Sequence, residues 1–163
     1  MKYNVVKYPD ERLKLPSSSI DIINDELKEL IVDMFEVMYA TDGIGLSAVQ
    51  IGIHKRLFVM DVPGKGKMAV INPKISEVSK ETSTYEEGCL SLPGISADIT
   101  RPKKVKLEYT DVEGKPAVLK ASGLLATCIQ HEYDHLDGKL FVDRLKADEK
   151  LKKLMEYRKF NNL

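Results

Sequence analysis

The segment LLATCIQHEYDHLDG, residues 124–138, constrains the fold more than any other part of the chain. Its first half is apolar nearly all round, and Gly138 stands where a helix would end. A helix of that composition belongs inside a protein. The same segment nevertheless carries HEYDH, residues 131–135, and burying two histidines and two acids is costly unless they have partners. The sequence therefore predicts a buried helix that carries a polar site.

His131 and His135 are four residues apart, so on a helix they share one face, about one turn from each other. Two imidazoles placed in this way can chelate one metal ion. Glu132 follows the first histidine and can reach a water molecule beside the metal without being a ligand itself. This is the H-E-x-x-H pattern of metal-dependent hydrolases. The pattern also occurs by chance, and the histidines would then be core or surface residues with ordinary hydrogen bonds.

The third ligand separates the classes of metal site. Metzincin-type proteases have a histidine where this chain has Phe141, which excludes that class. His54 lies beside two cationic residues, and we expect it to be exposed. Cys128 is seven residues from His135, roughly 10 Å along a helix, which is too far for a compact site. Cys89 remains: it is either the third ligand of a site with one open position or a small buried hydrophobe.

The rest of the pattern predicts an α+β fold, with antiparallel sheets packed around the buried central helix that carries the H-E-x-x-H pattern. Asn24 is a candidate N-cap for an amphipathic helix over residues 25–40. A second flanking helix over residues 147–160 carries an apolar stripe made by Leu151, Leu154 and Met155. The glycine-rich segment at residues 41–52 indicates a tight turn. Strands are expected at residues 56–62, 68–78, 105–111 and 115–121, the last two joined as a hairpin.

The length indicates a single domain over residues 1–163. Lys and Arg together number 25, as do Asp and Glu, so no overall field favours nucleic acid or a membrane surface. The N-terminal segment has no apolar stretch of the kind found in secretory signals, and no run approaches the roughly 20 apolar residues of a membrane span. With two cysteines, we expect a cytoplasmic protein that binds neither a membrane nor DNA directly.

Three segments then occur together and in order: GIGLSAVQ at residues 43–50, EGCLS at 87–91 and QHEYDH at 130–135. Together they resemble the signature motifs of the peptide deformylases, G-x-G-x-A-A-x-Q, E-G-C-L-S and H-E-x-D-H. The resemblance extends along nearly the whole chain, and the complete motif set and short length are similar to the bacterial branch. Ser47 departs from the first motif, which usually has Ala there. Since both residues are small, we expect only local packing to differ.

The resemblance implies a metallohydrolase that removes the N-formyl group from the N-terminal formyl-methionine of nascent polypeptides and releases formate. Glu132 would transfer protons at the attacking water. The side-chain amide of Gln50 and the backbone N–H of Leu90 would stabilise the oxyanion. One divalent metal ion would be bound, natively Fe²⁺ in many members, with Zn²⁺, Ni²⁺ or Co²⁺ as substitutes. The three metal ligands would be Cys89, His131 and His135.

The resemblance also suggests where the substrate lies. The backbone at Ile44 and Gly45 would pair with an extended peptide chain. Ile44 and Cys128 are candidates for the pocket that takes the methionine side chain, although Cys128 could equally be a core residue. Asp134 and Arg101 are candidates for orienting ligands or neighbouring loops.

In similar bacterial enzymes the C-terminal helix is associated with docking at the ribosome. From Lys146 to Lys159 this chain has six basic side chains against three acidic ones, which suits an RNA-rich surface. Such a charge run is more commonly just a solvated helix face.

Two other functions are compatible with an H-E-x-x-H pattern. A metallopeptidase would cut internal amide bonds, but Phe141 and the cysteine-containing second motif argue against it. A structural metal site would be closed by four protein ligands, whereas only three candidates are present here, with an acid beside them that such a site does not need.

Overall fold

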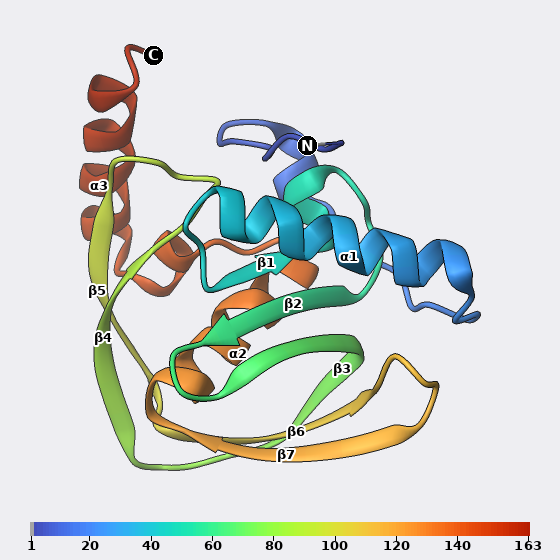
Figure 1. The fold of residues 1–163 in the computed structure, drawn as a ribbon. Coiled ribbons are helices and arrows are strands. Elements are labelled where there is room, and N and C mark those ends of the chain that lie inside the picture. The colour runs from blue at the N-terminus through green and yellow to red at the C-terminus, as the bar shows by residue number, and fades with distance from the viewer. Residues whose placement is uncertain (1) are drawn as a thin grey trace.

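The computed structural model describes residues 2–163, and its helices and strands form the α+β fold that the sequence predicts (Figure 1). The α-helices are α1 (Asp25–Ala40), α2 (Gly123–Leu136) and α3 (Ala147–Phe160). Three short 3₁₀ helices are η1 (Glu11–Lys14), η2 (Ala48–Ile51) and η3 (Phe141–Arg144). The strands are β1 (Gly45–Ser47), β2 (Leu57–Val62), β3 (Gly66–Val78), β4 (Thr82–Gly88), β5 (Ser96–Pro102), β6 (Lys104–Thr110) and β7 (Pro116–Ser122).

The strands form two antiparallel sheets. One has five strands in the order β1-β2-β3-β6-β7, and the other is the hairpin of β4 and β5. The predicted hairpin between β6 and β7 is confirmed, with Thr110 paired to Pro116 around a turn that contains Gly114. Since β1 stands at one end of the larger sheet, one of its edges is left without a strand of that sheet.

Strand β2 is buried on both faces, which explains why its sequence LFVMDV is almost continuously apolar. Successive side chains of a strand point to opposite faces. Leu57 and Val59 pack in the cluster that includes the buried face of α1, whereas Phe58 and Met60 pack in the cluster that includes α2. Both helices contact β1 and β2. The sheet is thus covered by one helix on each face.

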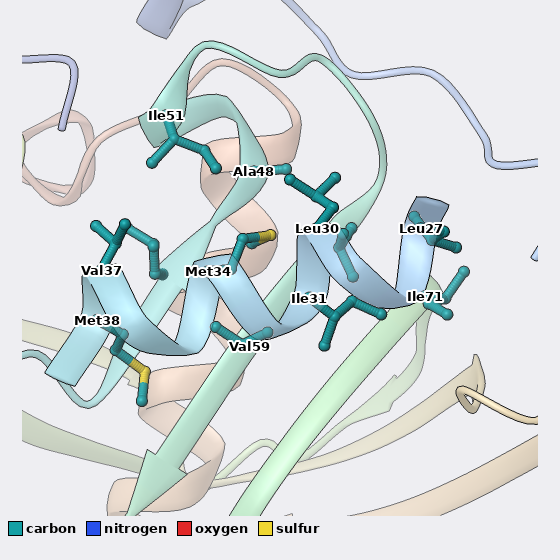
Figure 2. Close-up of a cluster of buried hydrophobic side chains, with 12 residues drawn as sticks. Leu27, Leu30, Ile31, Met34, Val37, Met38, Ala48, Ile51, Val59 and Ile71 are labelled. Atoms are coloured by element: carbon teal, nitrogen blue, oxygen red, sulfur yellow. The ribbon is translucent and has the colours of Figure 1, made fainter. Parts of the chain in front are cut away.

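Helix α1 forms where its sequence pattern predicts. The side chain of Asn24 accepts a hydrogen bond from the backbone N–H of Leu27, which caps the first turn. Figure 2 shows its apolar side chains directed at Ala48, Ile51 and Val59. The buried residues of α1 are Leu27, Leu30, Ile31, Met34, Val37 and Met38. This helix therefore packs against the segment from β1 to η2.

Helix α2 is buried along most of its length, as its composition predicts. It ends at Leu136, with Asp137 as the C-cap, and Gly138 follows with a positive φ of 76°. A Cβ at Gly138 would collide with the backbone of Lys14, so only glycine fits this turn. Within residues 2–163, no helix is both long and apolar enough to cross a membrane.

Helix α3 lies at one edge of the molecule beside the hairpin of β4 and β5 (Figure 1). Only part of its expected apolar stripe faces the protein: Leu154 packs into a core cluster, but Leu151 and Met155 are 61% and 62% exposed. The buried anchor is instead Tyr157, whose hydroxyl donates to the carbonyl of Tyr8. Because a tyrosine combines a large apolar ring with a polar tip, it can anchor a helix that is otherwise charged.

The sequence pattern missed regular structure in two regions. The hairpin of β4 and β5 lies in a region where no strand was expected, and residues 45–51 form β1 and η2 where a tight turn was expected. In β5 the inward positions are Ala97, Ile99 and Arg101. A charged residue at an inward position hides the apolar alternation on which strand prediction relies.

The packing of α1 gives a direct test of this arrangement. Met34 is fully buried in the cluster of Figure 2, whereas Val32 on the same helix is 65% exposed. We expect Met34→Ala to lower the free energy of unfolding by about 2–5 kcal/mol, because it leaves a cavity. Val32→Ala should change that free energy by no more than about 0.5 kcal/mol. Urea denaturation of both variants measures the difference, and equal effects would contradict the packing described here.

Candidate active site and metal centre

Two histidines of α2 and one cysteine after β4 bring their ligand atoms together. The Nε2 atoms of His131 and His135 are 3.3 Å apart, and Sγ of Cys89 is 3.4 Å from Nε2 of His135. The three ligand atoms all lie within 4.8 Å of one another. The histidines are one helical turn apart, as their spacing predicts. Cys89 directly follows β4, and contacts of β4 with α2 bring it to the same place.

The chemistry of this group fits a divalent metal ion. Two imidazole nitrogens and one thiolate sulfur are good ligands for such an ion once they are deprotonated. Burial lowers the pKa of His135, and the positive charges of His131 and Arg101 act in the same direction, so its ring favours the neutral form that a metal requires. The group of Cys89, His131 and His135 could therefore hold one metal ion.

A buried chain of charged groups stands behind the histidines. Nδ1 of His131 is 2.9 Å from Oε1 of Glu87. Arg101 donates two hydrogen bonds to Glu87, of 2.8 and 3.0 Å, and a third, of 2.9 Å, to Asp134. Arg144 donates to the same Asp134 carboxylate. These contacts fix the orientation of the His131 ring, as carboxylates commonly do for histidines that bind metals.

The two buried carboxylates behind the histidines, Glu87 and Asp134, are held in their charged form. Burial by itself would raise the pKa of Glu87, but hydrogen bonds from His131 and Arg101 outweigh it and lower the pKa. Burial likewise opposes the ionisation of Asp134, and the hydrogen bonds from Arg144 and Arg101 again lower the pKa. Arg101 lies between the two carboxylates, so each buried charge has a partner of opposite sign.

Glu132 is buried beside the histidines. Burial raises its pKa, although the charge of His131 and a hydrogen bond from Ser47 act against the rise. The hydroxyl of Ser47 lies 3.0 Å from Oε1 of Glu132. The expectation that Ser47 differs from Ala only in packing is therefore wrong, because an alanine could not make this contact.

Gln50 is also buried, and all of its amide atoms have partners. Its Oε1 accepts from the backbone N–H of Ser47 at 3.0 Å. Its Nε2 donates to Oγ of Ser91 at 3.1 Å and lies 3.5 Å from Sγ of Cys89. The amide is therefore oriented with its donor toward the cysteine.

A cavity of about 410 Å³ opens next to these groups. Glycines at positions 43 and 45 allow the backbone to approach it closely, since a Cβ at Gly45 would press on the Glu132 carboxylate and Cys128. Nine residues were expected from the sequence to bind the metal, bind the substrate or take part in catalysis. Eight of them line the cavity, and the ninth, His135, does not. The eight are Ile44, Gly45, Gln50, Cys89, Leu90, Cys128, His131 and Glu132.

The two remaining histidine and cysteine candidates lie outside the ligand group. Cys128 is buried, with Sγ 4.0 Å from the carbonyl oxygen of Ile44. His54, expected to be exposed, is half-buried, and its Nε2 lies 2.9 Å from the carbonyl oxygen of Arg12.

Sequence reasoning gave no role to Glu87, Ser91 or Arg144. The first two stand inside the EGCLS segment, so their place beside Cys89 was a usable signal. Arg144 gives no such signal, since its contact with Asp134 depends on the turn of chain after α2.

The amino-acid sequence is similar to known peptide deformylases. Residues 2–151 match the family model described as polypeptide deformylase. The chain is 46% identical over 163 residues to peptide deformylase 1 of Pseudomonas syringae pv. tomato, with 97% of each chain covered. It is 48% identical over 155 residues to the peptide deformylase of Azotobacter vinelandii, with 92% of each covered.

Solved structures give the same result. The crystal structure of peptide deformylase from Ehrlichia chaffeensis superimposes with a TM-score of 0.93 at 38% identity, covering 98% of this chain and 97% of that one. The same protein in complex with actinonin also has a TM-score of 0.93, covering 99% and 98% of the two chains. By sequence match and by fold, this chain belongs to the polypeptide deformylase family.

Proposed function

We propose that residues 1–163 form a single deformylase domain that hydrolyses the N-formyl group of formyl-methionine at the start of nascent polypeptides and releases formate. The observation that carries this proposal is the group of Cys89, His131 and His135, with Glu132 beside it, at the wall of a cavity. Family membership supports the reaction class. A protein with this substrate would act in the cytoplasm.

Cys89, His131 and His135 would hold one divalent ion. When bound, it would activate water and polarise the formyl oxygen. We propose Fe²⁺ as the native ion, with Zn²⁺, Ni²⁺ or Co²⁺ as functional substitutes. A site with two nitrogens and one sulfur binds zinc more tightly than ferrous iron, so metal supply and oxidation decide which ion a preparation contains.

Glu132 is positioned to move protons. Its carboxylate would accept a proton from the attacking water and deliver that proton to the departing amine nitrogen. The raised pKa that burial gives Glu132 suits a group that must both take up and release a proton.

Two donors would stabilise the negative charge that develops on the formyl oxygen. The first is Nε2 of Gln50, whose orientation is fixed because Oε1 of the same amide accepts from Ser47. The second is the backbone N–H of Leu90, which follows Cys89 directly and belongs to a residue lining the cavity. Donors that are already oriented cost no rearrangement during the reaction.

The open edge of β1 offers a place for the peptide. The carbonyl of Ile44 accepts from the backbone N–H of Asp61 in β2. Hydrogen bonding alternates along an antiparallel strand, so the N–H and C=O of the next residue, Gly45, point away from β2. Gly45 is therefore the better candidate for pairing with the substrate backbone. The side chains of Ile44 and Cys128 line the cavity that would take the methionine side chain.

A comparison of formylated and unformylated peptides separates this function from its alternatives. We expect release of formate from a formyl-Met peptide and no cleavage of the same peptide without the formyl group. Cleavage of internal amide bonds would indicate a metallopeptidase instead. Absence of both activities from a fully metallated chain would indicate a structural metal site.

The two cysteines make a matched pair for testing the ligands. Cys89 belongs to the ligand group and Cys128 does not, although both line the cavity. We expect Cys89→Ala to lose the metal and Cys128→Ala to keep it, with at most a changed substrate preference. Elemental analysis of the two purified variants measures this. If both lose metal equally, the ligand assignment is wrong.

Glu132→Gln tests the proton transfer. Glutamine is nearly isosteric and keeps a hydrogen-bonding group, but it cannot carry the proton. We expect turnover of a formyl-Met peptide to fall by about 10²–10⁴-fold. Metal content and melting temperature should change little. A fully metallated variant that retains more than roughly a tenth of the activity would exclude this role for Glu132, and a metal-free variant would show that Glu132 supports the ligands instead.

We propose in addition that α3 docks on an RNA-rich surface of the ribosome. Its exposed side includes the basic residues Lys146, Lys152, Arg158 and Lys159, together with exposed Leu151 and Met155. Removing the helix would be a poor test, because Tyr157 is buried and Asn161 donates to the carbonyl of Pro93 near the cavity.

Charge reversal of α3 avoids that difficulty. We expect the triple variant Lys152→Glu, Arg158→Glu, Lys159→Glu to weaken salt-sensitive cosedimentation with ribosomes and to spare hydrolysis of a short formyl-Met peptide. Reversal of three exposed lysines on β6, β7 and their connection serves as the control and should leave cosedimentation unchanged; these are Lys104, Lys115 and Lys120. Equal effects in both variants would exclude a specific role for α3.

A further inference from the structure

Ser47 contacts both side chains that the proposed mechanism uses. Its backbone N–H donates to Oε1 of Gln50 at 3.0 Å. Its hydroxyl oxygen lies 3.0 Å from Oε1 of Glu132 and 3.0 Å from the backbone carbonyl oxygen of Glu132. Ser47 is fully buried at the end of β1, so water does not compete for these contacts.

The contact matters because a glutamate carboxylate rotates easily about its last bond. In this structure the two carboxylate oxygens have different surroundings. Oε1 faces the hydroxyl of Ser47, whereas Oε2 lies so close to Gly45 that no Cβ would fit between them. The side chain is thus held between a hydrogen bond on one side and the backbone of β1 on the other.

We propose that Ser47 is a positioning residue for deformylation, whose hydroxyl fixes the rotation of the Glu132 carboxylate beside the cavity. The inference rests on the proposed function, because it assigns to Ser47 an effect on the residue that would carry the proton. A hydroxyl has one proton and can also accept a hydrogen bond. Its single proton goes to one of the two acceptors at a time, and the hydrogen bond to Oε1 is the contact that fixes the carboxylate.

The position also makes a clean experiment. Ser47→Ala removes a single oxygen atom and leaves the backbone N–H that orients Gln50. Alanine is the residue that the first signature motif usually has here, so the variant is expected to fold. Ser17 supplies the control, because its hydroxyl is also buried but has no hydrogen-bond partner among residues 2–163.

Steady-state kinetics on a formyl-Met peptide, at matched metal content, test the role. We expect Ser47→Ala to lower kcat by roughly three- to tenfold, the effect of one hydrogen bond, with KM changed by no more than about twofold. Ser47→Thr, which keeps the hydroxyl, should recover most of the loss, and Ser17→Ala should match the parent. An unchanged kcat in Ser47→Ala would overturn the proposal.

A double-mutant cycle decides whether Ser47 acts through Glu132. In a Glu132→Gln background we expect Ser47→Ala to have no further effect on kcat, because the proton carrier is already lost. A loss as large as in the parent would mean that Ser47 supports the site in some other way, and the proposal would be wrong. This cycle also covers the case in which the extra methyl group of threonine disturbs the buried position.

Crystallography gives a readout that does not depend on turnover. In Ser47→Ala we expect the Glu132 carboxylate to be rotated or to occupy more than one orientation. A single, unchanged orientation would overturn the inference. If the parent protein itself fails to release formate from a formyl-Met peptide, the proposed function fails, and the crystal structure still shows whether Ser47 positions Glu132.

Discussion

A single buried guanidinium, that of Arg101, joins the hairpin that carries the cysteine to the helix that carries the histidines. It donates to Glu87 on β4 and to Asp134 on α2, and Glu87 in turn contacts His131. Buried charges are tolerated only when each is paired and hydrogen-bonded. Arg101 can pair with both carboxylates only when β4, β5 and α2 are packed as they are here, and the same packing brings Cys89 to the histidines.

The glycine-rich segment before Gln50 completes the site from the opposite side. Helix α1 packs on the face of β1 and η2 that is turned away from α2, and this packing fixes the backbone of the segment. Gly45 allows β1 to lie directly against the Glu132 carboxylate. The next inward residue, Ser47, then reaches Glu132 with its hydroxyl and Gln50 with its N–H. Packing of α1 on one face of β1 thus fixes the backbone from which Ser47 contacts Glu132 and Gln50 on the other face.

Much of the fold and of the candidate site could be predicted from local pattern. The i,i+4 spacing of His131 and His135 requires a helix, and the apolar residues around it require burial, so α2 followed from the sequence. Elimination left Cys89 as the candidate third ligand, with a small buried hydrophobe as the alternative, and the fold places it beside the two histidines. The argument for α2 succeeds because the spacing within a single helix determines it.

The remaining features depend on contacts between distant parts of the chain. The resemblance suggested Arg101 as an orienting group, but its acidic partners Glu87 and Asp134 are seen only in the fold. Ser47 reads as a small packing residue, although it lies 85 positions before the glutamate that it contacts. Tyr157 anchors α3 by a hydrogen bond from its hydroxyl to the carbonyl oxygen of Tyr8, 149 positions away. Sequence periodicity contains no information about such pairs.

X-ray absorption at the metal edge, on the chain of residues 1–163 purified without oxygen, tests the central claim most directly. The account predicts one metal ion per chain, bound by one sulfur and two imidazole nitrogens, with the remaining scattering from light atoms such as water oxygen. For zinc, the metal–sulfur distance should be about 2.3 Å. Two sulfur ligands would place Cys128 in the site, and scattering without sulfur would remove Cys89 from it. Either result would contradict the centre on which the proposed function depends.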